Sequence, residues 1–156
     1  MKLRDLCSRD VVTAEAPATL REASLLMRQG HVGALVVIER QGGAERPVGI
    51  VTDRDIVVAV IAVPGARPEG IRVGDIMSSP VVLVRESDGV FEALRAMSEH
   101  GVRRLPVVAE DGTLAGIVTA DDVLRVVAAE LANLGTALRR GREREATERG
   151  RLEFPS

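Results

Sequence analysis

The sequence predicts an α+β protein built from two copies of one β-α-β-β-α unit, on three observations. The segment GIVTDRD, Gly49–Asp55, recurs almost unchanged as GIVTADD, Gly116–Asp122. Upstream, residues 5–38 align without gaps on residues 75–108 at a constant offset. The connecting turn is longer in the first copy, after which the register is regained. Because a chance match cannot hold register over so many positions, the repeat indicates a duplicated structural unit.

The start of each copy reads as a short turn or helix, a brief extended segment and then a helix. The turns are expected at 3–8 and 74–78, and the extended segments at 11–13 and 81–84. In the first copy Thr19 and Glu22 form a capping box, apolar residues follow at helical spacing, and Gly30 is expected to end the helix. The second copy repeats the apolar stripe, and Gly101 ends it.

The rest of each copy reads as a strand hairpin followed by a helix. Strands separated by a glycine-containing turn are expected at 34–38 and 48–51, and again at 105–108 and 114–118. The last helix begins after Thr52 in the first copy and after Thr119 in the second. The resulting organisation is a first repeat, a Pro- and Gly-containing linker, a second repeat and a charged C-terminal tail or helix extension, at 1–62, 63–73, 74–134 and 135–156.

One unit of about 60 residues with a three-stranded sheet has too little core to be stable alone. Packing two units sheet to sheet solves this and gives a globule with pseudo-two-fold symmetry and a pair of equivalent clefts between the halves. After Asp122 the last helix runs on with a wide apolar face, and beyond Gly135 it becomes rich in Arg and Glu. A solvated helix or frayed tail is favoured there over a partner or nucleic-acid contact.

Composition excludes several functions. The net charge of -2 gives no field toward nucleic acid or an anionic membrane, and only Phe91 and Phe154 are aromatic. The longest apolar run, Ile56–Pro64, is far below the roughly 20 residues that span a bilayer. The N-terminus lacks a signal-peptide core and Cys7 is the single cysteine, so we expect a cytoplasmic protein without an internal disulfide.

The Thr-x-x-Asp corners, Thr52 to Asp55 and Thr119 to Asp122, have two interpretations. Each forms a capping box that needs no ligand. The same hydroxyl, carboxylate and free helix N–H groups also suit a ribose or phosphate oxygen, and the two roles are compatible. The sequence contains no phosphate loop, dinucleotide glycine motif, metal-ligand spacing or nucleophile-base pair, which argues against an enzyme.

The duplicated unit, the strand entry RRLPVV and the G-h-V-T-x-x-D signature at both copies resemble a CBS-domain pair, the regulatory module named after cystathionine β-synthase. The resemblance covers roughly residues 1–134, and GIVTDRDI is similar to small stand-alone bacterial members. It implies a homodimer that binds an adenosine-containing ligand (AMP, ADP, ATP or S-adenosylmethionine) between the repeats, requires no cofactor and regulates a separate, unknown partner protein. The alternative is a structural dimerisation module with unoccupied clefts.

The resemblance also implies site residues in each cleft. The first cleft would be built from Ile50, Thr52, Arg54, Asp55, Met77, Val82, Val102, Arg103, Arg104 and Pro106. The second would be built from Cys7, Val12, Val32, Gly33, Ala34, Ile117, Thr119, Asp121 and Asp122. Backbone N–H and C=O groups at Val12 and Val32, or at Val82 and Val102, would read the adenine edge while aliphatic side chains hold the ring.

The two clefts differ in charge. Arg54, Arg103 and Arg104 suit a phosphate, whereas Asp121, Gly33 and Ala34 occupy the matching positions of the second cleft. We therefore expect the first cleft to bind a phosphorylated adenosine, and the second to be empty or to hold an uncharged or cationic adenosyl group. Surface ion pairing is the alternative role for Arg103 and Arg104. For His31 and His100, charge complementarity with a helix end is favoured over metal binding or catalysis.

Overall fold

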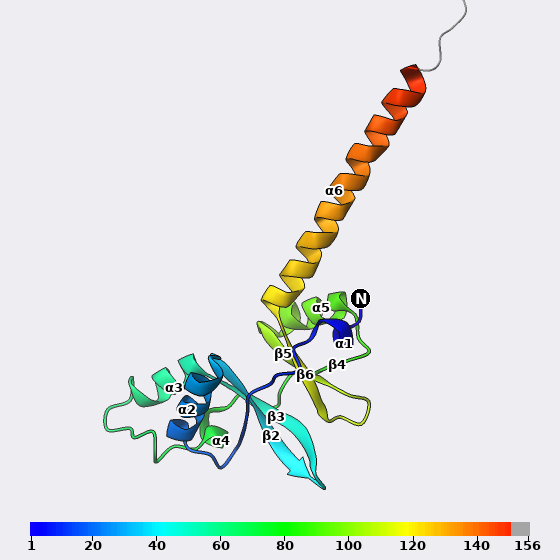
Figure 1. The fold of residues 1–156 in the computed structure, drawn as a ribbon. Helices are drawn as coiled ribbons and strands as arrows, with labels where there is room; N and C mark the ends of the chain where they lie inside the picture. Colours follow the sequence, from blue (N-terminus) through cyan, green and yellow to red (C-terminus); the bar gives the residue numbers. More distant parts are fainter. Residues whose placement is uncertain (151–156) are drawn as a thin grey trace, which may run out of the picture. The chain divides into compact units, whose positions relative to one another are not determined.

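Each repeat folds as β-α-β-β-α behind a short helix, as the sequence predicts (Figure 1). The computed structural model describes residues 1–150, so the end of the predicted tail, with Phe154, lies outside the described residues. The first repeat comprises α1 (Leu3–Leu6), β1 (Thr13–Glu15), α2 (Leu20–Gly30), β2 (Ala34–Gln41), β3 (Ala44–Thr52) and α3 (Asp53–Val60). The second comprises α4 (Val73–Ile76), β4 (Val84–Arg85), α5 (Val90–His100), β5 (Arg104–Val108), β6 (Leu114–Thr119) and α6 (Ala120–Gly150).

The chain divides into two compact units, the first spanning Met1–Ala120 and the second beginning at Asp121. The first unit contains both sheets, and the second contains nearly all of α6. The division into repeats, linker and tail that the sequence predicts stays a prediction. No helix within residues 1–150 is both long enough and apolar enough to cross a membrane.

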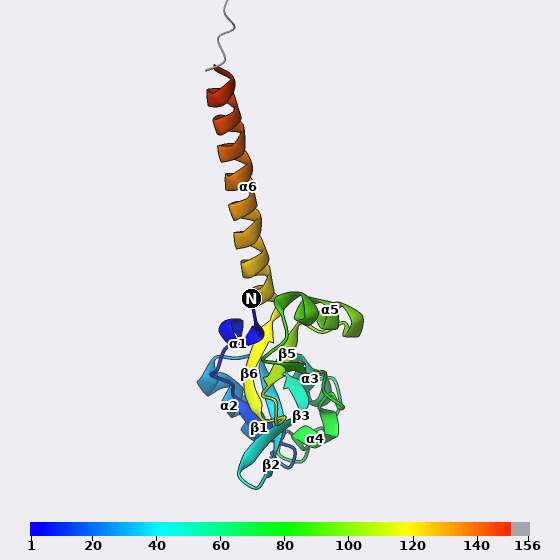
Figure 2. The same cartoon turned by 90° about the vertical axis from the view of Figure 1, so that its right-hand side faces the viewer.

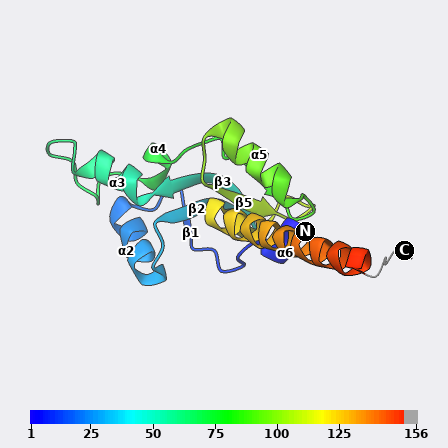
Figure 3. The same ribbon diagram turned by 90° about the horizontal axis from the view of Figure 1, so that it is seen from above.

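Two three-stranded sheets form the centre of the first unit. In each, the first strand runs parallel to the second and the second antiparallel to the third, in the orders β1-β2-β3 and β4-β5-β6. The middle strands are the most buried, with Leu35, Val37, Leu105 and Val107 fully inaccessible to solvent. The sheets meet where β3 lies against β6 (Figure 2). In the first repeat, α2 and α3 lie side by side (Figure 3).

The predicted capping box at the start of α2 is confirmed. The Thr19 hydroxyl accepts from the Glu22 N–H at 3.2 Å, and the Thr19 N–H donates to the Glu22 carboxylate at 2.7 Å. The helix ends at Gly30, as expected, and the residue that follows it in the left-handed conformation is His31, with φ 52°. Gly30 stays helical and is small for another reason, since a Cβ there would lie 2.7 Å from Val12 Cγ2.

Replacing Thr19 with alanine should lower the free energy of unfolding by about 1 kcal/mol, because one helix N–H loses its acceptor. Bonds from Thr19 lower the pKa of Glu22. A lowered carboxyl pKa stabilises the fold above the unfolded-state value, and this stabilisation is lost as the pH falls. The Thr19 N–H, the largest cause of the lowered pKa of Glu22, remains in Thr19→Ala, whereas the hydroxyl bond is lost, so the variant should flatten the acid side of the stability profile measured by urea unfolding in part. Gln29→Ala, an exposed change in the same helix, should leave the profile unchanged, and an equal effect of both variants would contradict the prediction.

The strand boundaries differ from those expected. The extended segments begin later than predicted, at Thr13 and Val84, because only there do they pair with β2 and β5. The first hairpin is longer than predicted, since the ladder between β2 and β3 continues to Gln41 and Ala44. The first repeat has Val36 at the position of Pro106 in the second repeat. Val36 still lies within a regular strand, because it pairs with both neighbouring strands of the sheet.

The short leading helices exchange partners between the repeats. In sequence α1 belongs to the first repeat, yet the Leu3 N–H donates to Asp88 O at 2.9 Å and the Arg4 N–H to Glu86 O at 3.0 Å. Beyond α1, Ser8 and Ile117 exchange a pair of backbone hydrogen bonds of 2.9 Å. The leading segment of the chain is therefore part of the second repeat's structure.

The converse holds for α4, which packs on the first repeat. The Val73 N–H donates to Ala18 O at 2.8 Å and the Gly74 N–H to Ala16 O at 2.9 Å. The side chain of Val73 is fully buried in the hydrophobic core of the first repeat. Each repeat therefore completes the structure of the other.

Candidate functional site

A cleft of about 710 Å³ lies between segments of the two repeats, within the first unit. The first repeat contributes the end of β3 and the start of α3. The second contributes the segment before β4 and the turn from α5 into β5. Its lining residues are Ile50, Thr52, Arg54, Ser78, Pro80, Val81, Val82, His100, Gly101, Val102, Arg103 and Arg104. Its volume falls within the range of pockets that hold small-molecule ligands, roughly 300–1,000 Å³.

The structure brings most of the predicted first-cleft residues together here. Ile50, Thr52, Arg54, Val82, Val102, Arg103 and Arg104 line the cleft, whereas three predicted residues do not. Asp55 directs its carboxylate back to the Thr52 N–H, at 2.8 Å. Met77 packs against Gly49, where a Cβ would lie 2.7 Å from its sulfur, and the side chain of Pro106 is buried in β5. That the seven lining residues bind a ligand stays a prediction.

The sequence did not indicate five lining residues: Ser78, Pro80, Val81, His100 and Gly101. Ser78 reaches the cleft because it exchanges backbone hydrogen bonds with Ile50, of 2.8 and 3.2 Å. His100 was assigned a helix-end role only. Its place two positions before Val102, a predicted site residue, was the signal that could have identified it.

The Thr52 corner forms the capping box that its spacing predicts. The Thr52 hydroxyl accepts from the Asp55 N–H at 3.2 Å, and the Thr52 N–H donates to the Asp55 carboxylate. A hydroxyl can still donate its proton, and a carboxylate has further lone pairs. The capping role is therefore confirmed, and it leaves the Thr52 hydroxyl, which lines the cleft, able to donate to a ligand.

The charge in the cleft is positive. Of the described residues, no acidic side chain lines it, and the guanidinium groups of Arg54, Arg103 and Arg104 form no ion pair within residues 1–150. Arg103 and Arg104 therefore do not form the surface ion pairs that were their alternative role, within residues 1–150. Three unneutralised arginines at one cleft provide the donors that an anionic oxygen requires.

Two backbone N–H groups of the segments predicted to read adenine form hydrogen bonds within the protein. The Val102 N–H donates to Met97 O at 3.0 Å, and the Val32 N–H donates to Met27 O at the same distance. Both groups are satisfied inside helix ends. These two N–H groups are therefore already engaged within the protein, and the prediction that backbone groups of these segments read an adenine edge stays a prediction.

Val82 offers a carbonyl acceptor because of a proline. In the first repeat the Val36 N–H donates to Val12 O at 3.2 Å. The equivalent of Val36 in the second repeat is Pro106, which has no N–H. The Val82 carbonyl, at the cleft, therefore lacks the bond that occupies its counterpart Val12.

The predicted second cleft is described only in part. Ile117 bonds to Ser8 as above, and Cys7 packs on Gly116, where a Cβ would lie 2.7 Å from the sulfur. Gly33 accepts from the Asp53 N–H at 2.9 Å, so an acid already stands beside it. Val12, Val32, Ala34 and Thr119 also belong to the first unit, whereas Asp121 and Asp122 belong to the second. The binding role of this set stays a prediction.

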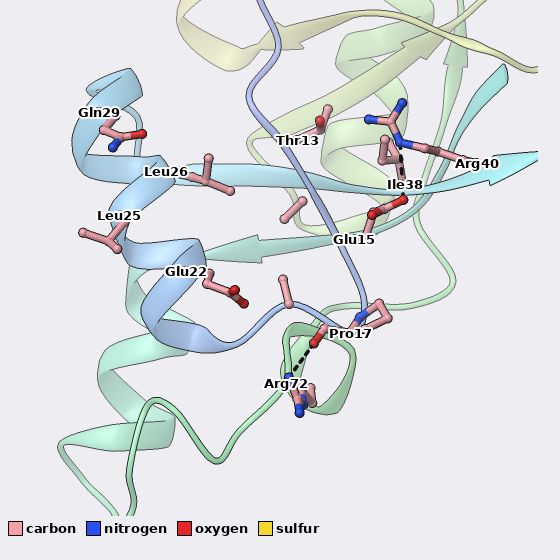
Figure 4. A pocket seen from close by; sticks show the side chains of 12 residues that line it. Thr13, Glu15, Pro17, Glu22, Leu25, Leu26, Gln29, Ile38, Arg40 and Arg72 are labelled. Atoms are coloured by element: carbon pink, nitrogen blue, oxygen red, sulfur yellow. Dashed lines mark hydrogen bonds and ion pairs between the residues drawn. The ribbon is translucent and has the colours of Figure 1, made fainter. Parts of the chain in front are cut away.

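Another cavity, of about 680 Å³, lies between α2 and the edge strand β1 (Figure 4). Its charged groups are largely paired, because Arg40 forms an ion pair with Glu15 at 3.4 Å and Arg72 donates to Pro17 O at 2.9 Å. The arginine-lined cleft differs from it in having unpaired cations. Within residues 1–150, no group of three or more His, Cys, Asp or Glu side chains is arranged to hold a metal ion.

Comparison with known proteins identifies the family. The profile of the CBS domain matches residues 3–62 and again residues 73–129. The chain belongs to the CBS domain family. The two matches correspond to the two repeats, so the fold is that of a CBS-domain pair, and such pairs are generally regulatory, non-catalytic modules.

Proteins similar to this CBS-domain pair include the following three, and two of them have been solved with ligands. Protein MK0525 of Methanopyrus kandleri is 38% identical over 122 residues, which cover 78% of this chain and 60% of that protein. The cytosolic domain of the Mg²⁺ channel MgtE, solved in complex with ATP, is 32% identical with a TM-score of 0.65, covering 78% of this chain and 46% of that one. The CBS-domain pair of protein MJ0100, solved with 5'-methylthioadenosine and S-adenosylmethionine, shares the fold with a TM-score of 0.70 at 24% identity, covering 83% and 98%.

Proposed function

We propose that this CBS-domain pair is a sensor that binds a phosphorylated adenosine, AMP, ADP or ATP, in the arginine-lined cleft. The observation that carries the proposal is the set of Arg54, Arg103 and Arg104 at one cleft without an acidic partner. Each guanidinium can donate charge-assisted hydrogen bonds to phosphate oxygens. His100 lines the same cleft.

The rest of the nucleoside finds suitable groups in the same cleft. The Thr52 hydroxyl, with Asp55 behind it, suits the ribose, and the aliphatic side chains of Val82 and Val102 suit the faces of the base. The Val82 carbonyl is an acceptor for the exocyclic amino group of adenine. The ATP complex of MgtE, a relative at 32% identity, supports this ligand class.

Regulation would arise because the cleft is lined from both repeats. A ligand in contact with both stabilises the arrangement to which it binds more tightly, and it shifts the population toward that arrangement. We propose that the protein acts in this way as a homodimer on a separate partner protein. The second cleft, with acidic residues in its predicted set, would be empty or hold an uncharged or cationic adenosyl group.

The test is isothermal titration of the whole protein with AMP, ADP, ATP, adenosine and S-adenosylmethionine. We expect at least one phosphorylated ligand to bind at least tenfold more tightly than adenosine, since a single charge-assisted hydrogen bond contributes about 1.5–3 kcal/mol. Raising the salt concentration should reduce the difference in affinity between the phosphorylated ligand and adenosine, because salt screens the charges. Tighter binding of S-adenosylmethionine would contradict the phosphate role. Absence of binding, with an unchanged melting temperature for all five, would favour a structural dimerisation module.

A further inference from the structure

Helix α6 carries a stripe of apolar side chains along one face. Its members, here called the α6 seam, are Leu124, Val127, Leu131, Leu134 and Leu138. The four leucines are each more than half exposed, at 65%, 63%, 56% and 59% in chain order. Contiguous apolar surface of this kind marks an interaction site in a folded protein.

Two glycines lower the intrinsic stability of α6. Gly135 and Gly141 lie in its interior, and each costs about 1 kcal/mol relative to alanine. Most helices in proteins are stabilised by packing of an apolar face and not by intrinsic propensity. Occupation of the seam would supply that packing.

The spacing of the seam indicates what occupies it. Successive seam residues lie three and four positions apart in alternation, which is the a and d pattern of a coiled coil. Side chains with this period of 3.5 fit between those of a helix with the same period. The small residues Ala128 and Gly135 flank the seam and allow close approach.

We propose that the α6 seam binds a second copy of this chain, with the two α6 helices antiparallel. In this arrangement Leu131 packs against Leu134 of the second copy, and Val127 against Leu138. Symmetry repeats both layers, so these four of the five seam residues are covered in each copy.

Charge selects the antiparallel orientation over the parallel one. In the antiparallel register, Asp121 of one copy lies opposite Arg142 of the other, and symmetry repeats this attractive pair. The parallel register places Arg144 of one copy beside Arg149 of the other, which is repulsive. The same two-stranded seam therefore has favourable flanking charges in one orientation only.

The orientation can be measured with a single spin label on the whole protein. The label is attached to a cysteine introduced as Ala146→Cys in a Cys7→Ala background, and inter-copy distances are measured by pulsed electron resonance. Antiparallel pairing sets the two labels about 27 residues apart along the axis, or about 40 Å at 1.5 Å per residue. Parallel pairing sets them at the same level, within about 20 Å for helices spaced by about 10 Å.

Two variants of equal charge test whether the seam is responsible. Leu131→Glu with Leu134→Glu should abolish the 40 Å distance, because charged groups enter the seam. Ala132→Glu with Asn133→Glu, which lie off the seam, should retain it, and circular dichroism should show both variants folded. A short distance, no inter-copy distance, or a 40 Å distance that survives in the seam variant would each overturn the proposal. Pairing with another protein would appear as absence of the inter-copy distance.

Discussion

Replacement of Arg104 by alanine is expected to weaken binding of the preferred adenosine phosphate by roughly 10- to 100-fold, the equivalent of one charge-assisted hydrogen bond. Arg104 is half-buried at the entry to β5 and lines the cleft, and its guanidinium has no ion-pair partner within residues 1–150. The substitution therefore removes a ligand contact without exposing a buried acid. Titration calorimetry of the variant with AMP, ADP and ATP gives the measurement.

Arg95→Ala is the matched control for this experiment. Arg95 lies on α5 in the same repeat and is exposed, and it does not line the cleft. Both variants lose one positive charge, so a general electrostatic effect would weaken binding equally in both. Affinity for adenosine, which has no phosphate, should change little in the Arg104 variant. Unchanged phosphate-ligand affinity in that variant would show that the arginines do not contact the ligand.

Leu3→Ala is expected to lower the free energy of unfolding by about 3 kcal/mol, since a fully buried leucine is truncated and a cavity remains. Because α1 packs on the second repeat and α4 on the first, we expect the loss of stability to affect both repeats. Leu3 belongs to the first repeat in sequence, but its N–H is bonded to Asp88 of the second. Both sheets should consequently unfold together at a lower urea concentration, in one transition.

Lys2→Ala is the control for the Leu3 variant, because Lys2 is adjacent and exposed. It should change the stability by less than about 0.5 kcal/mol. Urea unfolding followed by circular dichroism compares the two. A two-step curve, in which one sheet outlasts the other, would show that the exchanged helices do not couple the repeats.

The sequence was sufficient for the fold class because the repeat supplied each element twice. The capping boxes at Thr19 and Thr52 also followed from spacing, since Thr and an acid three residues later satisfy helix N–H groups wherever they occur. The left-handed residue at His31 did not follow. Glycine is the usual choice for that conformation, and Gly30 instead serves close packing against Val12.

The sequence predicted the arginines that line the cleft, but not which backbone N–H groups beside it are already used in hydrogen bonds. Arg54, Arg103 and Arg104 were assigned from the matching of motif positions. The use of the Val102 N–H by Met97 depends on how α5 ends, which periodicity does not specify. The exchange of α1 and α4 was also beyond reach, because an apolar pattern shows that a face is buried without naming what covers it.

The exchanged leading helix has a consequence for synthesis on the ribosome. Ser8 pairs with Ile117, so its partner is made only when most of the described chain has been translated. Closing so long a loop is slow compared with local helix formation. During translation Leu3 therefore stays without Asp88, and Ser8 without Ile117, until those residues have been synthesised.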